Sequence, residues 1–232
     1  MVMKNRKKIL IISLTLLASF TCAAETVTKG MKKVIDDALD FSVKQSMSMF
    51  YEMKDQKGIL PRTAENGKMI TCESAWWTSG FYPGTLWYCY EYSNDPQIRA
   101  AAEEMTSRVE KQKYTTSNHD VGFIINCSFG NGYRLTHNET YRKVIETAAK
   151  SLSTRFHPVT GCTRSWNSKK WQFSVIIDNM MNLELLNVAS SLTGDNTYYN
   201  MAKSHADRTM INHFRPDGSS YHVVSYDTIT GK

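Results

Sequence analysis

The sequence has 232 residues, 41% of them hydrophobic, and its five prolines, twelve glycines and 11% aromatic content argue against disorder. Four of its 28 basic residues and none of its 22 acidic ones lie within the first 24 positions, which leaves a net charge of only +2 on the remaining chain. No basic run survives there, so nucleic acid is excluded as a partner, whereas a small anionic substrate is not.

The first residues predict a secretory signal peptide. Basic residues between positions 4 and 8 precede an apolar stretch at 9–20, and small residues follow at 21–24. The apolar stretch is shorter than the roughly 20 residues that a membrane span needs. We expect a signal peptide at 1–24 and an exported, periplasmic protein whose folded part is 25–232. The alternative is a lipoprotein, which would contact the membrane only through an anchor on Cys22.

Helical patterns dominate the rest of the chain. Between residues 29 and 54, most apolar residues are three or four positions apart, which is typical of an amphipathic helix. Further helices are predicted at 76–92, starting after Gly80, and at 95–111, 118–130, 140–156, 177–193 and 196–213. Strands are predicted at 170–173 and 221–226, long loops at 55–75, 157–172 and 214–232, and a turn at 130–132.

Three of these helices share a polar turn with Asn or Asp at the start, near Asn94, Asn138 and Asp195. The spacing indicates one helical hairpin per repeat, as in stacked or ring-like α-hairpin proteins. The chain supplies three or four hairpins and ends on a strand-turn pattern without a closing element. It is therefore interpreted as the front part of a longer all-α protein.

The cysteine pattern gives no metal site. Cys72, Cys89, Cys127 and Cys162 remain after the signal peptide and permit disulfides in three pairings. Cys89 and Cys127 stand in apolar segments and are expected in the core. No spacing of Cys and His suits a metal, and no nucleotide-binding or serine-hydrolase motif is present, so we expect neither metal nor cofactor.

Two aspartates adjoin apolar segments. Asp178 interrupts FSVIIDNMMNLELL, and Asp120 precedes the apolar residues of NHDVGFIIN. A buried carboxylate is costly unless it is paired or protonated. An aspartate before a helix is usually an N-cap. The other interpretation is catalytic, because apolar surroundings raise a carboxyl pKa and so provide a proton donor, and glycosidic chemistry uses paired or tuned carboxyl groups.

Four other side chains are candidates for binding a sugar. His119 precedes Asp120, His222 lies on a predicted strand, and Trp77 and Trp166 offer apolar ring faces, Trp166 from a polar loop. Each also has a structural interpretation, as a surface histidine or a core aromatic, and for Trp87 the core is favoured. Three nearby cations are interpreted as solvated loop charges rather than contacts of a carboxylate or sulfate: Arg164, Lys169 and Lys170.

Several longer motifs occur together, in order, from about residue 70 onward: WTSGFYPGTLWYCYEY, NHDVGFIINCSFGNGYRLT, TRSWN, VIIDNMMNLELLNVASSLTGD and RPDGSSYHVVSYD. With these motifs, the sequence resembles the unsaturated glucuronyl hydrolases of glycoside hydrolase family 88. The resemblance implies an (α/α)6 barrel, here truncated to its N-terminal three to four hairpins. It also implies a glycosidase that releases 4,5-unsaturated uronic acid from the non-reducing end of lyase-generated oligosaccharides.

The resemblance assigns roles to residues. It implies that Asp178 is the general acid and base, which protonates C4 of the vinyl ether while water adds at C5, and that Asp120 is its partner. It implies substrate contacts for His119, Trp77, Trp166 and His222.

Two alternatives stay open. One is an unsaturated rhamnogalacturonyl hydrolase acting on pectin fragments, which shares the fold. The other is an inactive carbohydrate-binding fragment, because the family continues past this chain with a further substrate-binding segment and more helices. The orientation of Asp178 distinguishes an enzyme from a structural protein. An enzyme requires Asp178 to face a cavity near Asp120, Trp77 and Trp166, whereas in a structural protein it would cap a helix at the surface.

Overall fold

The computed structural model describes residues 28–232, so the predicted signal peptide and Cys22 lie outside the described residues. The chain divides into two units, Met1–Asp40 and Phe41–Lys232. The first unit contributes the opening turns of helix α2 (Lys29–Met53), where Lys32 pairs with Asp36 and Lys33 with Asp37, each at 2.6 Å. In the described part, no helix is long and apolar enough to span a membrane.

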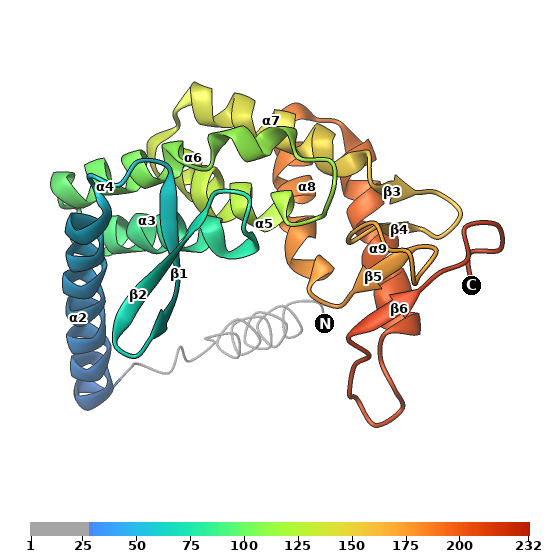
Figure 1. Ribbon diagram of the computed structural model, residues 1–232, viewed down its shortest axis with the longest axis horizontal. Coiled ribbons are helices and arrows are strands. Elements are labelled where there is room, and N and C mark those ends of the chain that lie inside the picture. Colours follow the sequence, from blue (N-terminus) through green and yellow to red (C-terminus); the bar gives the residue numbers. More distant parts are fainter. Residues whose placement is uncertain (1–27) are drawn as a thin grey trace, which may run out of the picture. The chain divides into compact units, whose positions relative to one another are not determined.

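Three helical hairpins follow one another in the second unit (Figure 1). The first consists of α3 (Phe81–Ser93) and α4 (Pro96–Ser107), and the third of α8 (Asn179–Thr193) and α9 (Asn196–Asn212). The middle hairpin pairs α7 (Glu139–Ser153) with a composite helix, made of α5 (Val121–Ile125), the π-helical turn η4 (Asn126–Gly130) and α6 (Asn131–Thr136). Two 3-10 helices complete the helical elements, η2 (Trp77–Gly80) and η3 (Glu110–Tyr114).

The same two-residue turn joins the helices of each hairpin. Its first residue adopts the left-handed backbone conformation that ends a helix, and its second caps the next helix by accepting a backbone N–H bond. The turns are Asn94–Asp95, His137–Asn138 and Gly194–Asp195, with φ of 55°, 53° and 74° at their first residues. The helix starts predicted from the repeat are therefore confirmed.

The largest core lies between the middle and third hairpins. It contains Phe123, Ile125, Leu152 and Leu185, all nearly or fully buried. Trp87 anchors a second core between α3 and α4, where it is fully buried and donates from its indole nitrogen to Thr106 Oγ1 over 2.9 Å. The predicted core role of Trp87 is confirmed. Apolar burial of this kind supplies the main free energy of folding.

The turn predicted at 130–132 is wrong, because Gly130 and Gly132 lie inside the composite helix. A Cβ at Gly130 would meet the Asn126 side chain, and one at Gly132 would meet Tyr141 and Trp87. These glycines therefore permit close packing of the helix and do not bend the chain.

The long loop predicted at 55–75 is also wrong. It contains an antiparallel hairpin of β1 (Ile59–Glu65) and β2 (Lys68–Glu73). Asn66 and Gly67 both have positive φ, 50° and 73°, which is the backbone of the type I′ turn that favours Asn-Gly.

Two short sheets lie beside the third hairpin. Strand β3 (Phe156–His157) pairs with β4 (Cys162–Thr163), and β5 (Ser174–Ile176) pairs with β6 (Val223–Ser225). The strand predicted at 221–226 is confirmed in its centre, whereas the strand predicted at 170–173 is wrong, because β5 begins only at Ser174.

The described cysteines are free thiols: Cys72, Cys89, Cys127 and Cys162. Cys89 is buried, as predicted, and Cys127 is half-buried against the main core. The disulfides that the sequence permits are thus not formed in this structure.

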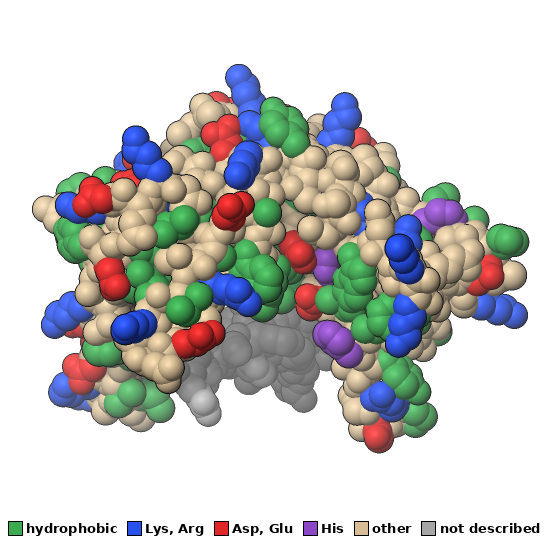
Figure 2. Space-filling view, viewed as in Figure 1, with side chains coloured by type: hydrophobic (Ala, Val, Ile, Leu, Met, Phe, Trp, Pro, Cys, Tyr) green, Lys and Arg blue, Asp and Glu red, His purple; other side chains and the backbone are tan. Residues whose placement is uncertain are grey.

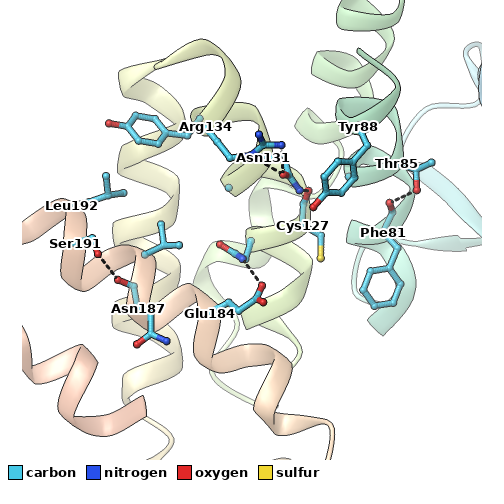
Figure 3. A pocket seen from close by; sticks show the side chains of 15 residues that line it. Phe81, Thr85, Tyr88, Cys127, Asn131, Arg134, Glu184, Asn187, Ser191 and Leu192 are labelled. Carbon is cyan, nitrogen blue, oxygen red and sulfur yellow. Dashed lines mark hydrogen bonds between the residues drawn. The ribbon is translucent and has the colours of Figure 1, made fainter. Parts of the chain in front are cut away.

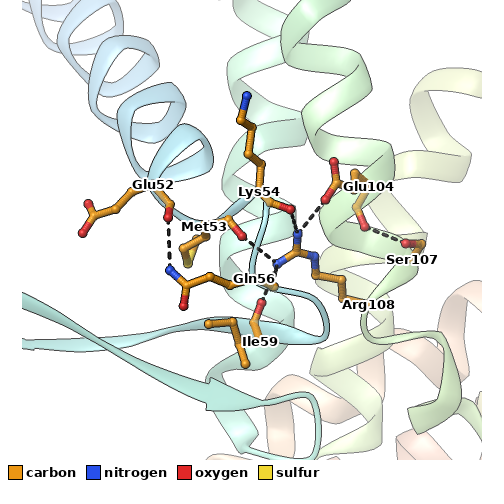
Figure 4. Close-up of polar contacts among 8 residues, drawn as sticks. All are labelled: Glu52, Met53, Lys54, Gln56, Ile59, Glu104, Ser107 and Arg108. Atoms are coloured by element: carbon orange, nitrogen blue, oxygen red, sulfur yellow. Dashed lines mark hydrogen bonds and ion pairs between the residues drawn. The ribbon is translucent and has the colours of Figure 1, made fainter.

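Arg108, next to the end of α4, holds the end of α2 in place (Figure 4). Its side chain is only 7% exposed and donates to the carbonyl oxygens of Lys54, Gln56 and Ile59 at 2.9–3.1 Å. It also pairs with Glu104 at 2.6 Å. A cation that bonds the last carbonyls of a helix satisfies acceptors that the helix itself leaves open.

Candidate active site

All six residues predicted for the site line one cavity of about 370 Å³: Trp77, His119, Asp120, Trp166, Asp178 and His222. They come from five separate places in the chain, since His119 and Asp120 are adjacent, and Asn118, Ser165 and Ile176 complete the lining. In Figure 2, acidic and histidine side chains gather near the centre of the face shown, beside hydrophobic ones. The structure thus brings the predicted residues together.

Backbone hydrogen bonds between loops assemble this cavity. His119 N–H donates to the carbonyl of Ser165 over 2.9 Å, next to an antiparallel bridge between Asn118 and Trp166. Ile177 N–H donates to the carbonyl of His222, also over 2.9 Å. These bonds fix the two histidines beside the loop and the strand that carry the other site residues.

Close packing of α5 against α8 brings the two aspartates together. Gly122 lies against Asn182, whose side chain would collide with any Cβ at that glycine. The N–H of Phe123 donates to Asn182 Oδ1 over 2.9 Å and joins the helices. Asp120 and Asp178 stand directly before the two helices and therefore reach the same cavity.

Neither aspartate caps its helix. Asp120 and Asp178 both have α-helical backbone angles, and their side chains make no capping bond. Asp95 and Asp195, in contrast, each accept a backbone N–H at 2.8 Å in the usual way. The Oδ1 atom of Asp178 is buried and has no hydrogen-bond partner among residues 28–232. The capping interpretation is excluded, and Asp178 faces the cavity.

The electrostatics of the cavity favour protonated carboxyl groups. Burial, reinforced by the negative charge of Asp178, raises the pKa of Asp120 to about 6. Burial also raises the pKa of Asp178, against the opposing effect of His222. A carboxyl group with a raised pKa can hold a proton near neutral pH and deliver it to a substrate.

His119 is buried and lies between Asn182 and Asp120. Its Nε2 atom is 3.2 Å from Asp120 Oδ1, and its Nδ1 atom is 3.3 Å from Asn182 Nδ2. Burial lowers the pKa of His119 to about 4, so the ring is neutral at physiological pH. His119 therefore acts on Asp120 as a neutral hydrogen-bonding group rather than as a cation.

Aromatic rings form two sides of the cavity. Trp77 is 46% exposed and contacts Phe123 edge-on, with ring centroids 6.4 Å apart. Trp166 is half-buried and lies edge-on to His119 at 6.5 Å. Both tryptophans expose surface next to the carboxyl groups, where core filling alone would have buried them.

Sequence reasoning missed the polar groups that support the site. Ser165 Oγ accepts from the N–H of Ile176 over 2.9 Å and shapes the cavity wall. Asn182 is fully buried one turn after Asp178 in α8, and an asparagine in that apolar helix was the available signal. Ser165 stands in a polar loop, where nothing in the sequence marks it.

A larger cavity of about 760 Å³ lies among α3, η4, α6 and α8 (Figure 3). The charged side chains that line it have partners within the protein: Glu184 accepts a hydrogen bond from Asn126, and Arg134 forms an ion pair with Glu91 at 2.6 Å. It contains no pair of buried carboxyl groups, so the smaller cavity is the better candidate for an active site. Among the described residues, no group of three or more His, Cys, Asp or Glu side chains could hold a metal ion.

Comparisons with known proteins find relatives over much of this chain. No family model matches the sequence. The unsaturated glucuronyl hydrolase of Formosa agariphila is 48% identical over 158 residues, which is 67% of this chain and 40% of the relative. The unsaturated chondroitin disaccharide hydrolase of Streptococcus pyogenes serotype M1 is 33% identical over 204 residues, which is 85% of this chain and 50% of the relative.

Solved structures extend the similarity to the fold. An unsaturated glucuronyl hydrolase specific for heparin is 42% identical, with a TM-score of 0.79 over 85% of this chain and 54% of that structure. The enzyme from Bacillus sp. GL1 is 29% identical, with a TM-score of 0.75 over 87% of this chain and 53% of that structure. The predicted fold class is confirmed, and the chain spans about half the length of these proteins. Over the residues it shares with them, the chain is a relative of the unsaturated glucuronyl hydrolases.

Proposed function

We propose that this chain carries the acid–base centre of an unsaturated glucuronyl hydrolase, a glycosidase that releases 4,5-unsaturated uronic acid from lyase-generated oligosaccharides. The observation that carries the proposal is the pair Asp120 and Asp178, which lie uncapped in one cavity with raised pKa values. The relatives' names support a glycosaminoglycan-type substrate, since they refer to chondroitin disaccharides and to heparin.

Asp178 is the proton donor in this mechanism. Its carboxylic acid protonates C4 of the C4=C5 vinyl ether, and the positive charge that develops at C5 is shared with the ring oxygen. The resulting carboxylate then accepts a proton from the water that attacks C5. The buried Oδ1 atom of Asp178 suits this role, because it has no hydrogen-bond partner in the described chain.

Hydration leads to bond cleavage without a further catalyst. The new hydroxyl at C5 makes that carbon a hemiketal, which opens to a ketone and leaves a hydroxyl on C1. C1 then bears both a hydroxyl and the remaining sugar, and this hemiacetal expels the sugar as the leaving alcohol. The enzyme therefore needs to catalyse only the addition of water.

The other cavity residues position the uronide. Asp120, ionised above its pKa of about 6, places negative charge next to the developing cation at C5. Trp77 and Trp166 present apolar ring surface to the sugar, and His222 lies beside Asp178 at the cavity wall. The stacking surfaces and the polar wall together hold C4 toward Asp178.

We also propose that the protein is exported. A periplasmic enzyme, or a lipoprotein anchored through Cys22, would receive oligosaccharides as polysaccharide lyases release them. The signal-like residues 1–24 support this location.

The test follows the ultraviolet absorbance of the conjugated uronide in lyase-made chondroitin disaccharides, with the full-length gene product that contains these residues. We expect the absorbance to fall with the natural protein and to persist with Asp178→Asn. Asp195→Asn is the matched control, because that aspartate caps a helix outside the cavity and asparagine caps equally well. Equal activity of Asp178→Asn and the natural protein would refute the assignment.

A further inference from the structure

A second polar cavity, of about 430 Å³, adjoins the candidate active site and is lined by two arginines and a histidine. Arg155, His157 and Arg164 line it together with Asn167, Gln172 and Thr228, and no carboxylate does. The segment 164–167 forms a wall between the two cavities: Ser165 and Trp166 line the active site, and their neighbours on either side line this one.

Arg155 is a buried cation with a free donor. It is only 8% exposed. Its Nε atom donates to the carbonyl of Arg164 over 2.8 Å, and its Nη1 atom to that of Thr116 over 2.6 Å. Its Nη2 atom is buried and has no partner within the described residues. Two bonds thus fix the guanidinium and leave its Nη2 atom without a hydrogen-bond acceptor in the described chain.

Arg164 faces Arg155 across the β3–β4 hairpin. Its N–H donates to the carbonyl of Arg155 over 2.9 Å, so the two arginines are held side by side. Its Nη2 atom donates to the carbonyl of Gln172 over 2.9 Å, whereas its Nε atom is buried without a partner. The loop charge that the sequence suggested as solvated is therefore half-buried and oriented.

The positive charge of Arg155 is only partly offset within the described part of the chain, where the carboxylate of Asp120 acts on it without forming an ion pair. Neither arginine forms an ion pair with a carboxylate there, although nine pairs of Lys or Arg with Asp or Glu form. The positive charge of Arg164 adds to burial in lowering the pKa of Arg155 to about 10. Adjacent like charges destabilise a hairpin, and buried ones still more. An anion between them would remove both penalties.

We propose that this cavity binds a tetrahedral oxyanion of the sulfate or phosphate class. Three unpartnered buried nitrogens, Arg155 Nη2, Arg164 Nε and His157 Nδ1, belong to residues that line it. A planar carboxylate is satisfied by one guanidinium, whereas donors on three separate side chains suit an ion with oxygens in several directions. Phe173, which lies 5.7 Å from both Arg164 and His157, gives the site an apolar floor.

The oxyanion has two possible sources, a free ion or a sulfate group carried by an oligosaccharide. The second source rests on the proposed function, because the wall shared with the active site would place a sulfated part of a bound sugar next to this cavity. Binding of a free ion does not depend on hydrolase activity.

The experiment titrates sodium sulfate into the full chain at constant ionic strength, by calorimetry and by thermal unfolding. We expect saturable binding that raises the melting temperature. Arg164→Gln and, separately, His157→Gln should weaken the affinity about tenfold or more, since each removes one donor. Arg99→Gln is the control: it also removes one positive charge, from an exposed pair on α4, and should bind as the natural chain does.

Circular dichroism establishes that each variant is folded before it is titrated. Absence of saturable binding, or equal binding by the natural chain and both cavity variants, would overturn the proposal.

A competition experiment then identifies the source of the oxyanion, with a sulfated and an unsulfated unsaturated disaccharide each competing with bound sulfate. Displacement by the sulfated sugar alone assigns the site to the oligosaccharide, and displacement by neither assigns it to the free ion. Asp178→Asn should bind sulfate normally, so failure of the hydrolase proposal leaves this result unaffected.

Discussion

The Nδ2 atom of Asn182 lies 3.3 Å from Nδ1 of His119, and this contact fixes which nitrogen of the imidazole carries the proton. Asn182 Oδ1 already accepts the N–H of Phe123, so its amide nitrogen faces the ring. His119 Nδ1 must then accept, and Nε2 keeps its hydrogen and donates to Asp120 over 3.2 Å. This donation favours the ionised form of Asp120, which is consistent with the proposal that Asp178 is the acid.

Replacing Asn182 by alanine should therefore lower the turnover number and destabilise the protein. In the variant, the buried N–H of Phe123 loses its acceptor, which should lower the free energy of unfolding by about 1–3 kcal/mol. The His119 ring also loses the amide that selects its tautomer. The nitrogen-15 shifts of His119 report the tautomer directly, and we expect Nε2–H in the natural protein and a mixture in the variant. Asn187→Ala, on the exposed face of the same helix, is the control. An unchanged tautomer in Asn182→Ala would contradict this chain of hydrogen bonds.

Asp120→Asn should stabilise the fold at neutral pH while it abolishes activity. The folded protein binds a proton at Asp120 up to pH about 6, whereas an ordinary aspartate loses it near 3.8. Stability is therefore lost as pH rises through that interval, because the ionised carboxylate is disfavoured in the cavity. The asparagine variant does not lose this stability, because its side chain does not ionise. Melting temperatures measured from pH 3.5 to 8 should show a gain that is present above pH 6 and shrinks toward pH 4. A gain independent of pH would point to packing instead.

Two buried neutral histidines should make the protein sensitive to acid. Burial lowers the pKa of His205 to about 3 and that of His119 to about 4, from an ordinary 6.5. The unfolded chain thus binds more protons between these values, so stability falls as pH decreases from about 6.5 toward 3. Urea unfolding across this range measures the slope. His205→Gln should flatten it, whereas His137→Asn, at an exposed left-handed position, should not. Parallel slopes in all three proteins would exclude His205 as a cause.

The sequence predicted the features that depend on local chemistry and missed those that depend on tertiary contact. Helix starts at Asn138 and Asp195 follow from capping side chains, which act within three residues. The hairpin at Asn66–Gly67 had a local signal too, but Pro61 and the polar residues of β1 obscured its alternation.

In the candidate site, too, the sequence indicated some residues, whereas the roles of others depend on tertiary contacts. The resemblance supplied the six residues that line the cavity, and Asp178 could also be found from its apolar surroundings. Asn182 acts only because α5 packs against α8, and Arg164 is oriented only because the β3–β4 hairpin places it beside Arg155. Such roles depend on residues far apart in the sequence, and no periodicity within one element reveals them.

Arg108→Ala should destabilise the protein by about 2–3 kcal/mol, because bonds from a buried charged donor contribute more than neutral ones. Its guanidinium bonds the carbonyls of Lys54, Gln56 and Ile59, and its removal leaves the part-buried carbonyl of Ile59 without this donor. Arg99→Ala is the matched control, since Arg99 makes a single exposed pair with Glu103 on the same helix, worth about 0.3–0.5 kcal/mol. Chemical denaturation of both variants measures the difference. A loss no larger for Arg108→Ala than for Arg99→Ala would show that water replaces these bonds, and that apolar contacts such as those of Met53 and Phe50 hold the end of α2.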